Sequence, residues 1–494
     1  MTIDTRVFVA GESAVSSSQN FTRRARKCTK IVATIGPACS SETIMRQLFK
    51  AGINVARLNM SHGEHADHLA NLQMIRRISQ ELERPVAVLA DLQGPKIRTG
   101  RLVDNKPVEW RVGDQVVITV ADCPEGTAKR VGTTYAGLAR DVVKGNVLLI
   151  DDGRMRVEVD HVDGDDIHGL VLVGGWLKSN KGINLPGVSV STPSMSDKDK
   201  SDLAWAIAND VDYIALSFVR TARDVRNLKS RIAESGRNIP IIAKIEKPEA
   251  VEHIEEILYE TDGIMVARGD LGIEISTQRL PVVQKDLIYK ANRMGKLVIT
   301  ATQMLESMIE SPIPTRAESS DVANAIFDGS DAVMLSGETA YGKYPVEAVA
   351  EMTRIAVEAE KSPYMATVKL DRTSAPFNNF AFAFSGAADH LSRELNANGV
   401  MVLSNSIEKA LLLSKRRGKG PIVALCYDER TWRQMSLFWG ITPVLIPFMD
   451  NLQDQVEKAT EECLRFKIFD EGDTIVVISG ISANGGNTIK VYQI

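Results

Sequence analysis

Short apolar runs recur along this chain, and most of them end on a charged or hydroxyl residue. Continuous apolar runs of this length are typical of strands buried on both faces, as in a parallel sheet. Eight of them lie between residues 31 and 336: Ile31–Thr34, Asn54–Arg57, Val86–Asp91, Tyr213–Ser217, Ile241–Lys244, Ile264–Arg268, Leu297–Thr302 and Ala332–Ser336.

The spacing of the runs predicts how the strands are connected. Most neighbouring runs are separated by enough residues for a helix and two loops, which is the connection that parallel strands need. Eight such units predict an α/β fold, a (β/α)8 TIM barrel. The carboxyl ends of the strands converge at one end of such a barrel, so the polar residues that end the runs are expected to share one site.

The interval between the third and fourth runs is much longer than the others. Residues 97–186 contain short, β-branched and partly alternating runs, separated by turn sequences such as Asp151-Asp152-Gly153. We interpret this segment as a small β-barrel domain inserted at the carboxyl end of strand three, where it is expected to act as a lid over the site.

The last part of the chain has the texture of a separate open α/β domain. Five strand-like runs begin at Val400, Ile422, Pro443, Thr474 and Ile489. We therefore expect an N-terminal arm (1–27), a barrel in two parts (28–96 and 187–357), the inserted domain (97–186) and a C-terminal domain (358–494).

Composition excludes several classes of function. A net charge of −4 and a pI near 6.1 argue against broad nucleic-acid binding. No run of 18 apolar residues occurs, so no membrane-spanning segment is predicted. The five cysteines are odd in number and never spaced C-x-x-C, which fits a cytoplasmic protein without a disulfide framework or zinc site.

Charged residues at the strand ends suggest a site for phosphate and a divalent cation. Arg57 suits bidentate phosphate recognition, although a surface salt bridge is the simpler alternative. Lys244 and Glu246 alternate onto one side of their strand. Glu246 and Asp270 together form a candidate Mg²⁺ site, the alternative being an ion pair of Lys244 with either acid.

Two hydroxyl residues end the last two runs. Thr302 is a candidate for donating or relaying a proton, and a core threonine that bonds a carbonyl is the alternative. Ser336 begins a Ser-Gly-Glu-Thr sequence that either frames a phosphate or caps a helix. No Walker-type loop and no Ser-His or Cys-His pair for acyl transfer is present, so phosphoryl transfer is the chemistry these residues favour.

Over residues 28 to 494 the sequence resembles the pyruvate kinase family. The motifs that carry the resemblance are Ile35–Pro37, Arg57–Gly63, Gly94–Gly100, Lys181–Gly187, Ala243–Glu246, Met265–Gly272, Ala301–Met308, Pro314–Glu318 and Met334–Thr339. The resemblance implies transfer of phosphate from phosphoenolpyruvate to ADP, through an enolate that Mg²⁺ or Mn²⁺ stabilises and that is then protonated. The products would be ATP and pyruvate, as in the last step of glycolysis, and the assembly a homotetramer.

The resemblance also assigns roles to matching residues. Lys244 would stabilise the phosphoryl group in flight and the enolate oxygen, while Glu246 and Asp270 would hold the metal. The substrate would meet Arg57 and the backbone of Gly269 and Asp270, and Thr302 would take part in protonation. The nucleotide would meet Arg98, Lys181, Asn59 and His62.

The sequence departs from the family pattern at a cation site. Many members bind K⁺ with a carboxylate and a threonine at the positions of Lys96 and Leu92. We expect the Lys96 ammonium, near Asn59, Ser61 and Asp91, to supply the charge of K⁺, so that K⁺ is not required. An incidental surface lysine is the alternative.

The second departure lies in the C-terminal domain, which in the family serves regulation and assembly. In Ser404–Lys409, Ile407 and Glu408 stand where Gly and a basic residue are usual, and the loop from Gly480 to Asn487 is short. We therefore do not expect fructose 1,6-bisphosphate as activator, and another phosphorylated effector, or none, stays open. Rival interpretations are a Mg²⁺-dependent lyase barrel and a catalytically silent scaffold. The first leaves the inserted domain and the Arg57–Arg98 pair unexplained, and the second is disfavoured because Lys244 and both acids are present.

Overall fold

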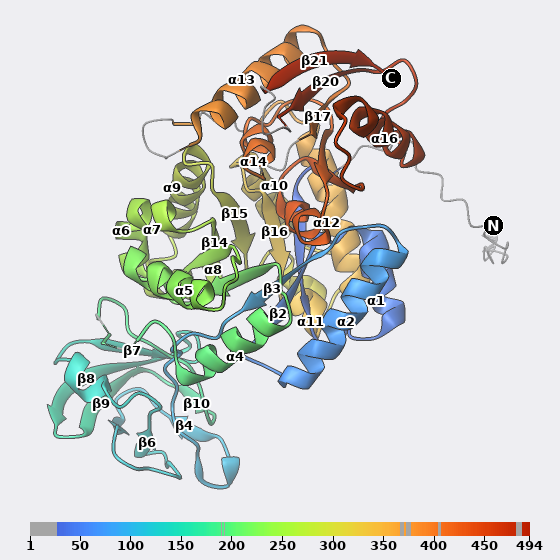
Figure 1. Cartoon of the computed structure of the whole chain (residues 1–494). Coiled ribbons are helices and arrows are strands. Elements are labelled where there is room, and N and C mark those ends of the chain that lie inside the picture. Colours follow the sequence, from blue (N-terminus) through green and yellow to red (C-terminus); the bar gives the residue numbers. More distant parts are fainter. Residues whose placement is uncertain are drawn as a thin grey trace, which may run out of the picture.

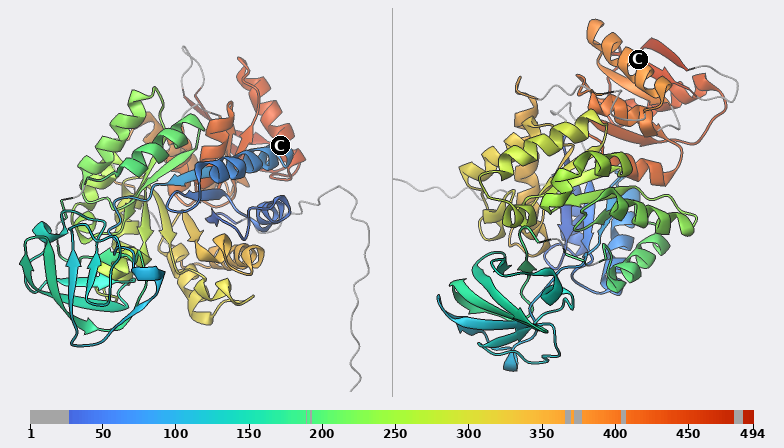
Figure 2. Two further views of the ribbon diagram at one scale, coloured as in Figure 1. Left: turned by 90° about the horizontal axis from the view of Figure 1, so that it is seen from below. Right: turned by 90° about the vertical axis from the view of Figure 1, so that its left-hand side faces the viewer.

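The computed structural model describes residues 27–188, 190–191, 193–365, 370–371, 377–403, 407–480 and 487–494. Their elements form three parts (Figure 1): a central barrel, an inserted β domain at one end and a C-terminal α/β domain at the opposite end. The two further views show the same separation of the outer parts by the barrel (Figure 2).

Eight parallel strands close into a barrel, as the eight apolar runs predict. In ring order they are β1 (Lys30–Ile35), β16 (Ala332–Leu335), β15 (Leu297–Ala301), β14 (Gly263–Ala267), β13 (Ile241–Ile245), β12 (Tyr213–Leu216), β3 (Ala87–Asp91) and β2 (Val55–Asn59). Nearly every residue of these strands is buried, which explains why the runs are continuous rather than alternating.

Helices cover the outside of the barrel. Capping boxes begin several of them, such as the one at α10, where the Thr315 hydroxyl accepts from the backbone of Glu318. The helices of the barrel are α1 (Glu42–Ala51), α2 (His65–Glu81), α4 (Asp197–Ala208), α5 (Ala222–Glu234), α6 (Pro248–Glu252), α7 (Ile254–Glu260), α8 (Arg268–Glu274), α9 (Leu280–Arg293), α10 (Arg316–Phe327), α11 (Gly337–Ala340) and α12 (Pro345–Glu360).

The inserted domain lies between β3 and β12, and its predicted small β-barrel takes the form of a half-barrel. A six-stranded sheet runs β11 (Ile183–Asn184), β7 (Val147–Ile150), β8 (Met155–Asp163), β9 (Asp166–Val173), β5 (Gln115–Thr119), β6 (Arg130–Gly132). A second sheet pairs β10 (Gly175–Leu177) with β4 (Val108–Trp110), and α3 (Leu138–Asp141) is the one short α-helix assigned within the described domain. The short strands β11 and β6 form the two open edges.

The C-terminal domain is an open five-stranded sheet in the order β19 (Ile441–Leu445), β18 (Ile422–Cys426), β17 (Gly399–Leu403), β20 (Thr474–Ser479), β21 (Thr488–Gln493). Its helices are α13 (Asn379–Glu394), α14 (Ile407–Lys415), α15 (Glu429–Gln434) and α16 (Leu452–Arg465). Inward-facing barrel residues and side chains of this domain belong to one apolar cluster. The domain therefore docks at the amino ends of the barrel strands, away from the expected site.

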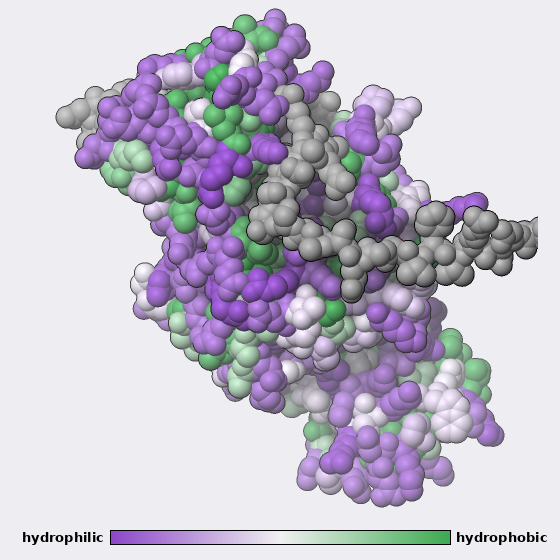
Figure 3. All heavy atoms as spheres, turned by 90° about the vertical axis from the view of Figure 1, so that its right-hand side faces the viewer, coloured by the Kyte–Doolittle hydropathy of each residue, from purple (hydrophilic) through white to green (hydrophobic). Residues whose placement is uncertain are grey.

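Two further predictions concern membrane-spanning segments and the N-terminal arm. None of the described helices is long and apolar enough to cross a membrane. Hydrophobic residues form separate small patches on the largely hydrophilic face shown in Figure 3. The predicted arm lies almost wholly outside the described residues.

Candidate active site

Lys244 lies at the centre of a group of polar side chains at the carboxyl ends of the barrel strands. Its ammonium donates to the Ser217 hydroxyl at 2.7 Å and lies 3.0 Å from Glu246 Oε1 and 3.3 Å from Asp91 Oδ1. Burial by itself would lower the pKa of Lys244, but the carboxylates of Asp91 and Glu246 raise it to about 12. A buried, permanently charged ammonium is thus fixed where a phosphate or an enolate oxygen could meet it.

Arg57 lies in the middle of β2 and faces the same group. Its Nε donates to Asp91 Oδ2 at 2.6 Å, and Nη1 donates to the Thr34 hydroxyl at 2.9 Å. Burial raises the pKa of Asp91, but the charges of Lys244 and Arg57 more than reverse this and lower it. Arg57 therefore does form a salt bridge, but the bridge is buried inside the site and not on the surface. It holds the guanidinium in place for binding an anion.

Glu246 and Asp270 are the acids available to a divalent cation. Glu246 is buried at the end of β13 and accepts the backbone N–H of Phe218 through Oε2 at 2.7 Å. Burial raises the pKa of Glu246, and the nearby charge of Asp270 adds to that effect, while Lys244 opposes it. A buried carboxylate that is repelled by a second, partly exposed one is an arrangement that a bound cation relieves.

The two carboxylates suit Mg²⁺ or Mn²⁺, and they are too few for a metal site formed by protein ligands alone. Within the described ranges, no group of three or more His, Cys, Asp or Glu residues could hold a metal ion. Mg²⁺ commonly takes one or two protein carboxylates and completes its shell with waters and substrate phosphate oxygens. Glu246 and Asp270 supply that number of carboxylates.

Thr302 follows β15 in a strained turn. Its φ is +67°, a conformation that a β-branched residue rarely adopts. The hydroxyl donates to the Ala301 carbonyl at 2.6 Å and accepts the Gly269 backbone N–H at 2.7 Å. The bond to the Ala301 carbonyl is the one expected of a core threonine. The strained φ and the hydrogen bond from Gly269 additionally place the hydroxyl next to the Gly269 backbone of the site.

Arg268 stabilises this turn, and sequence analysis did not assign it a role. Its guanidinium donates to the carbonyls of Ala301 and Thr302 and pairs with Asp321 at 2.7 Å. The sequence does mark Arg268 as a strand-end residue, because it ends the sixth apolar run. An arginine at a strand end is equally suited to bind phosphate, so its use as a support was not predictable from residue type.

The predicted nucleotide residues lie around the mouth of the site. Arg98 donates to the Asn180 carbonyl at 3.1 Å, and Lys181 pairs with Asp151 at 2.7 Å, both within the inserted domain. Asn59 accepts the Ser61 backbone N–H at 3.2 Å. Burial lowers the pKa of His62, and the charges of Arg98, Arg57 and Lys96 lower it further. His62 therefore lies in a cationic environment, as the binding site of an anionic ligand requires.

Lys96 does not make the predicted contact with Asp91. Its ammonium lies 3.5 Å from Asp270 Oδ1, and the ion pairs of Asp91 in the described chain are with Arg57 and Lys244. Asp91 is already surrounded by two buried cations, so a third would gain little, whereas Asp270 is accessible at the mouth. Leu92 is fully buried in the barrel core and offers no hydroxyl to a cation.

Ser336 and the effector loops of the C-terminal domain are the last predicted features. Ser336 precedes the short helix α11, and its backbone N–H donates to Glu338 Oε2 at 2.7 Å, so the carboxylate rather than the serine hydroxyl caps this turn. The predicted effector loops lie largely outside the described residues, which omit 404–406 and 481–486.

Comparisons with known proteins agree with this geometry. Residues 26–349 match the family model for the pyruvate kinase barrel domain, and residues 383–492 match that for the pyruvate kinase alpha/beta domain. The chain is 45% identical to pyruvate kinase 2 of Synechocystis over 458 residues, covering 92% of this chain and 76% of that protein. It is 43% identical to the pyruvate kinase of Mycobacterium intracellulare over 470 residues, covering 94% of this chain and 98% of the relative.

The fold also matches that of a solved structure. The crystal structure of a pyruvate kinase from Cryptosporidium parvum superposes with a TM-score of 0.88 at 36% identity, covering 95% of this chain and 96% of the other. The half-barrel insertion and the C-terminal sheet are thus included in the match. The chain belongs to the pyruvate kinase family, whose members transfer the phosphoryl group of phosphoenolpyruvate to ADP.

Proposed function

We propose that Lys244 carries the chemistry of this reaction. The observation that supports this role is the position of its ammonium among Asp91, Ser217 and Glu246 at the strand ends. There it would stabilise the phosphoryl group as it leaves phosphoenolpyruvate and then the negative enolate oxygen that remains. Release of pyruvate from phosphoenolpyruvate and ADP, followed in the Lys244→Met variant, tests the assignment.

Glu246 and Asp270 would hold Mg²⁺ or Mn²⁺. When bound, the divalent cation neutralises charge on the transferring phosphate and on the enolate oxygen. The raised pKa of Glu246 next to the Asp270 carboxylate supports this role, because the pair gains most from a shared cation.

The other strand-end residues would position substrate and proton. Arg57 would bind the transferring phosphate, and the backbone of Gly269 and Asp270 would receive the substrate carboxylate. Thr302 would take part in protonating the enol carbon, directly or through a water.

The nucleotide phosphates would lie between the barrel and the inserted domain. There Arg98 and Lys181 of the inserted domain would face Asn59 and His62 of the barrel. Closure of the inserted domain as a lid would exclude water from the transfer.

We further propose that activity does not require K⁺. Leu92 is buried in the core, and Lys96 brings a fixed ammonium to Asp270. That charge would act beside the metal-binding acid rather than beside Asp91. The wider expectations are a cytoplasmic homotetramer and, in the C-terminal domain, a phosphorylated effector other than fructose 1,6-bisphosphate or none.

A further inference from the structure

A buried polar cluster joins the inserted domain to the barrel. It contains Asn184 from β11, Lys247 after β13 and Glu274 at the end of α8, all less than a tenth exposed. Lys247 Nζ lies 2.5 Å from Glu274 Oε1, and Asn184 Nδ2 donates to the same oxygen at 3.0 Å. One carboxylate oxygen therefore receives a donor from each side of the domain junction.

Both barrel members of this cluster are next to the proposed metal ligands. Lys247 follows Glu246 directly in the chain. Glu274 lies four residues after Asp270 in the same helix, which places the two side chains on one face, a turn apart. The Lys247–Glu274 pair thus joins the end of β13 to α8, and the Asn184 amide adds a second contact to the same carboxylate oxygen.

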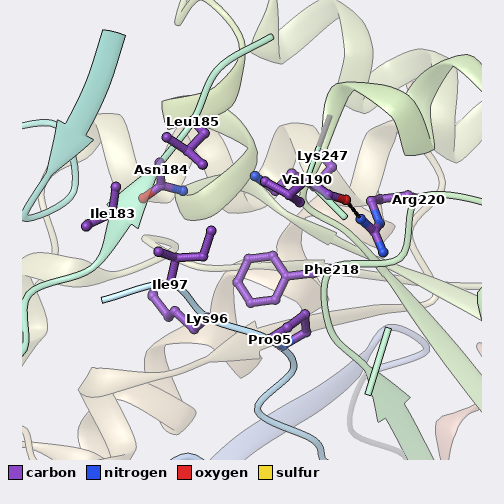
Figure 4. A pocket seen from close by; sticks show the side chains of 10 residues that line it. All are labelled: Pro95, Lys96, Ile97, Ile183, Asn184, Leu185, Val190, Phe218, Arg220 and Lys247. Carbon is purple, nitrogen blue, oxygen red and sulfur yellow. Dashed lines mark hydrogen bonds between the residues drawn. The ribbon is translucent and has the colours of Figure 1, made fainter. Parts of the chain in front are cut away.

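The link to the inserted domain is the less complete part of the cluster. Asn184 Oδ1 and Glu274 Oε2 are buried and have no hydrogen-bond partner among the described residues. Asn184 and Lys247 also line a small cavity of about 30 Å³ at the domain junction, together with Lys96 and Phe218 (Figure 4). The link from Asn184 to Glu274 is one hydrogen bond, which can break while the Lys247–Glu274 pair stays formed.

We propose that Glu274 is a positioning residue that couples the inserted domain to the metal site. This inference rests on the proposed role of Glu246 and Asp270 as metal ligands. While Asn184 is bonded to Glu274, the return strand of the inserted domain holds α8 in the position that directs Asp270 toward Glu246. Release of Asn184 loosens α8, so metal affinity falls, and by reciprocity a bound metal favours the attached domain.

The test compares Asn184→Ala with Asn146→Ala. The first cuts the link and leaves the Lys247–Glu274 pair in place. The second removes an asparagine of the same domain that accepts the Val143 backbone N–H at 2.7 Å, far from α8 in the chain. For each purified full-length variant, the dissociation constant of Mn²⁺ is measured from the free-ion EPR signal, alongside kcat at saturating Mg²⁺ and the urea midpoint.

The coupling predicts that Asn184→Ala weakens Mn²⁺ binding about tenfold, the scale seen when partners of metal ligands are removed. Its kcat at saturating Mg²⁺ should change less than about threefold, and Asn146→Ala should leave the Mn²⁺ affinity unaltered. Mn²⁺ should also slow hydrogen exchange of residues 182–188 in the parent protein and not in Asn184→Ala.

Glu246→Gln, measured in the same way, separates this inference from the proposed function. If Glu246→Gln weakens Mn²⁺ binding and Asn184→Ala lowers only the urea midpoint, the coupling is overturned and the metal site stands. If Glu246→Gln leaves Mn²⁺ binding intact, the metal site and the coupling both fail.

Discussion

The Lys244 ammonium lies 3.0 Å from a carboxylate oxygen of Glu246, two residues further along the same chain segment. Alternation along the end of β13 directs both side chains into the barrel mouth, so a cation and an acid with opposite tasks share one place. In our account the ammonium serves the transferring group, and the carboxylate serves the metal. Several predictions separate these tasks.

Glu246→Gln should raise the Mg²⁺ concentration needed for half-maximal activity by at least about tenfold, because an amide is a weaker ligand than a carboxylate. Steady-state rates over a Mg²⁺ titration measure this. Asp197→Asn is the matched control, since Asp197 is an almost fully exposed acid that pairs only with Lys200 in the described chain. Equal Mg²⁺ requirements in the two variants would contradict the metal assignment.

The unmodified chain should be no more active in KCl than in NaCl at the same ionic strength, because Lys96 supplies a fixed positive charge. Lys96→Glu, which removes that charge and adds a carboxylate, should lower activity and make it respond to K⁺. Several-fold activation of the unmodified chain by K⁺ over Na⁺ would refute K⁺ independence.

Thr302→Gly should leave the stability of the protein little changed while slowing pyruvate formation about a hundredfold. A glycine relieves the strain of a positive φ, of order 1–3 kcal/mol, which offsets the loss of the hydroxyl's hydrogen bonds to Ala301 and Gly269, and the variant lacks the hydroxyl needed for protonation. Gln303→Gly is the control, because exposed Gln303 has φ +53° and carries no proposed role in catalysis. If both variants lose activity equally, the turn matters and the hydroxyl does not.

Stability should depend on pH through Lys415, which is fully buried and pairs with Asp331 beneath the barrel. Burial lowers the pKa of Lys415 to about 8, although Asp331 opposes the shift. Between this value and the unfolded value near 10.5, the unfolded chain binds more protons than the folded one. The contribution of Lys415 to the free energy of unfolding therefore rises with pH across this window, by up to about 1.4 kcal/mol per pH unit.

Urea unfolding of the unmodified chain and of Lys415→Met, at about pH 7.5 and about pH 9.5, measures this contribution. The advantage of the unmodified chain over the variant should increase at the higher pH. A difference that stays constant would show that Lys415 titrates in the folded protein as it does in the unfolded chain.

The sequence predicts the barrel and the membership of the site because both follow from topology. A polar residue that ends an apolar run is expected near the carboxyl end of a strand, so Arg57, Lys244 and Thr302 are expected at one end of the barrel whatever the loops do. Asp270 follows the sixth run closely enough to share that position.

Contacts that depend on the packing of loops and helices were not predictable in this way. Lys96 was expected beside Asp91 because it stands where many pyruvate kinases bind K⁺ with a carboxylate, but Asp91 is enclosed by Arg57 and Lys244, and Lys96 pairs with Asp270. Strand content predicted the inserted domain but not its openness, since closure depends on whether two edge strands meet. The support that Arg268 gives to the Thr302 turn requires the turn itself to be known.

The measurement that tests the account most directly is pyruvate release from phosphoenolpyruvate and ADP with Mg²⁺, for the unmodified chain and for Lys244→Met. We predict that the unmodified chain forms pyruvate and ATP in equal amounts. Lys244→Met should still bind phosphoenolpyruvate in equilibrium dialysis, with kcat reduced at least about a hundredfold, as expected when a group that stabilises transition-state charge is removed. A near-normal kcat in Lys244→Met would contradict the account.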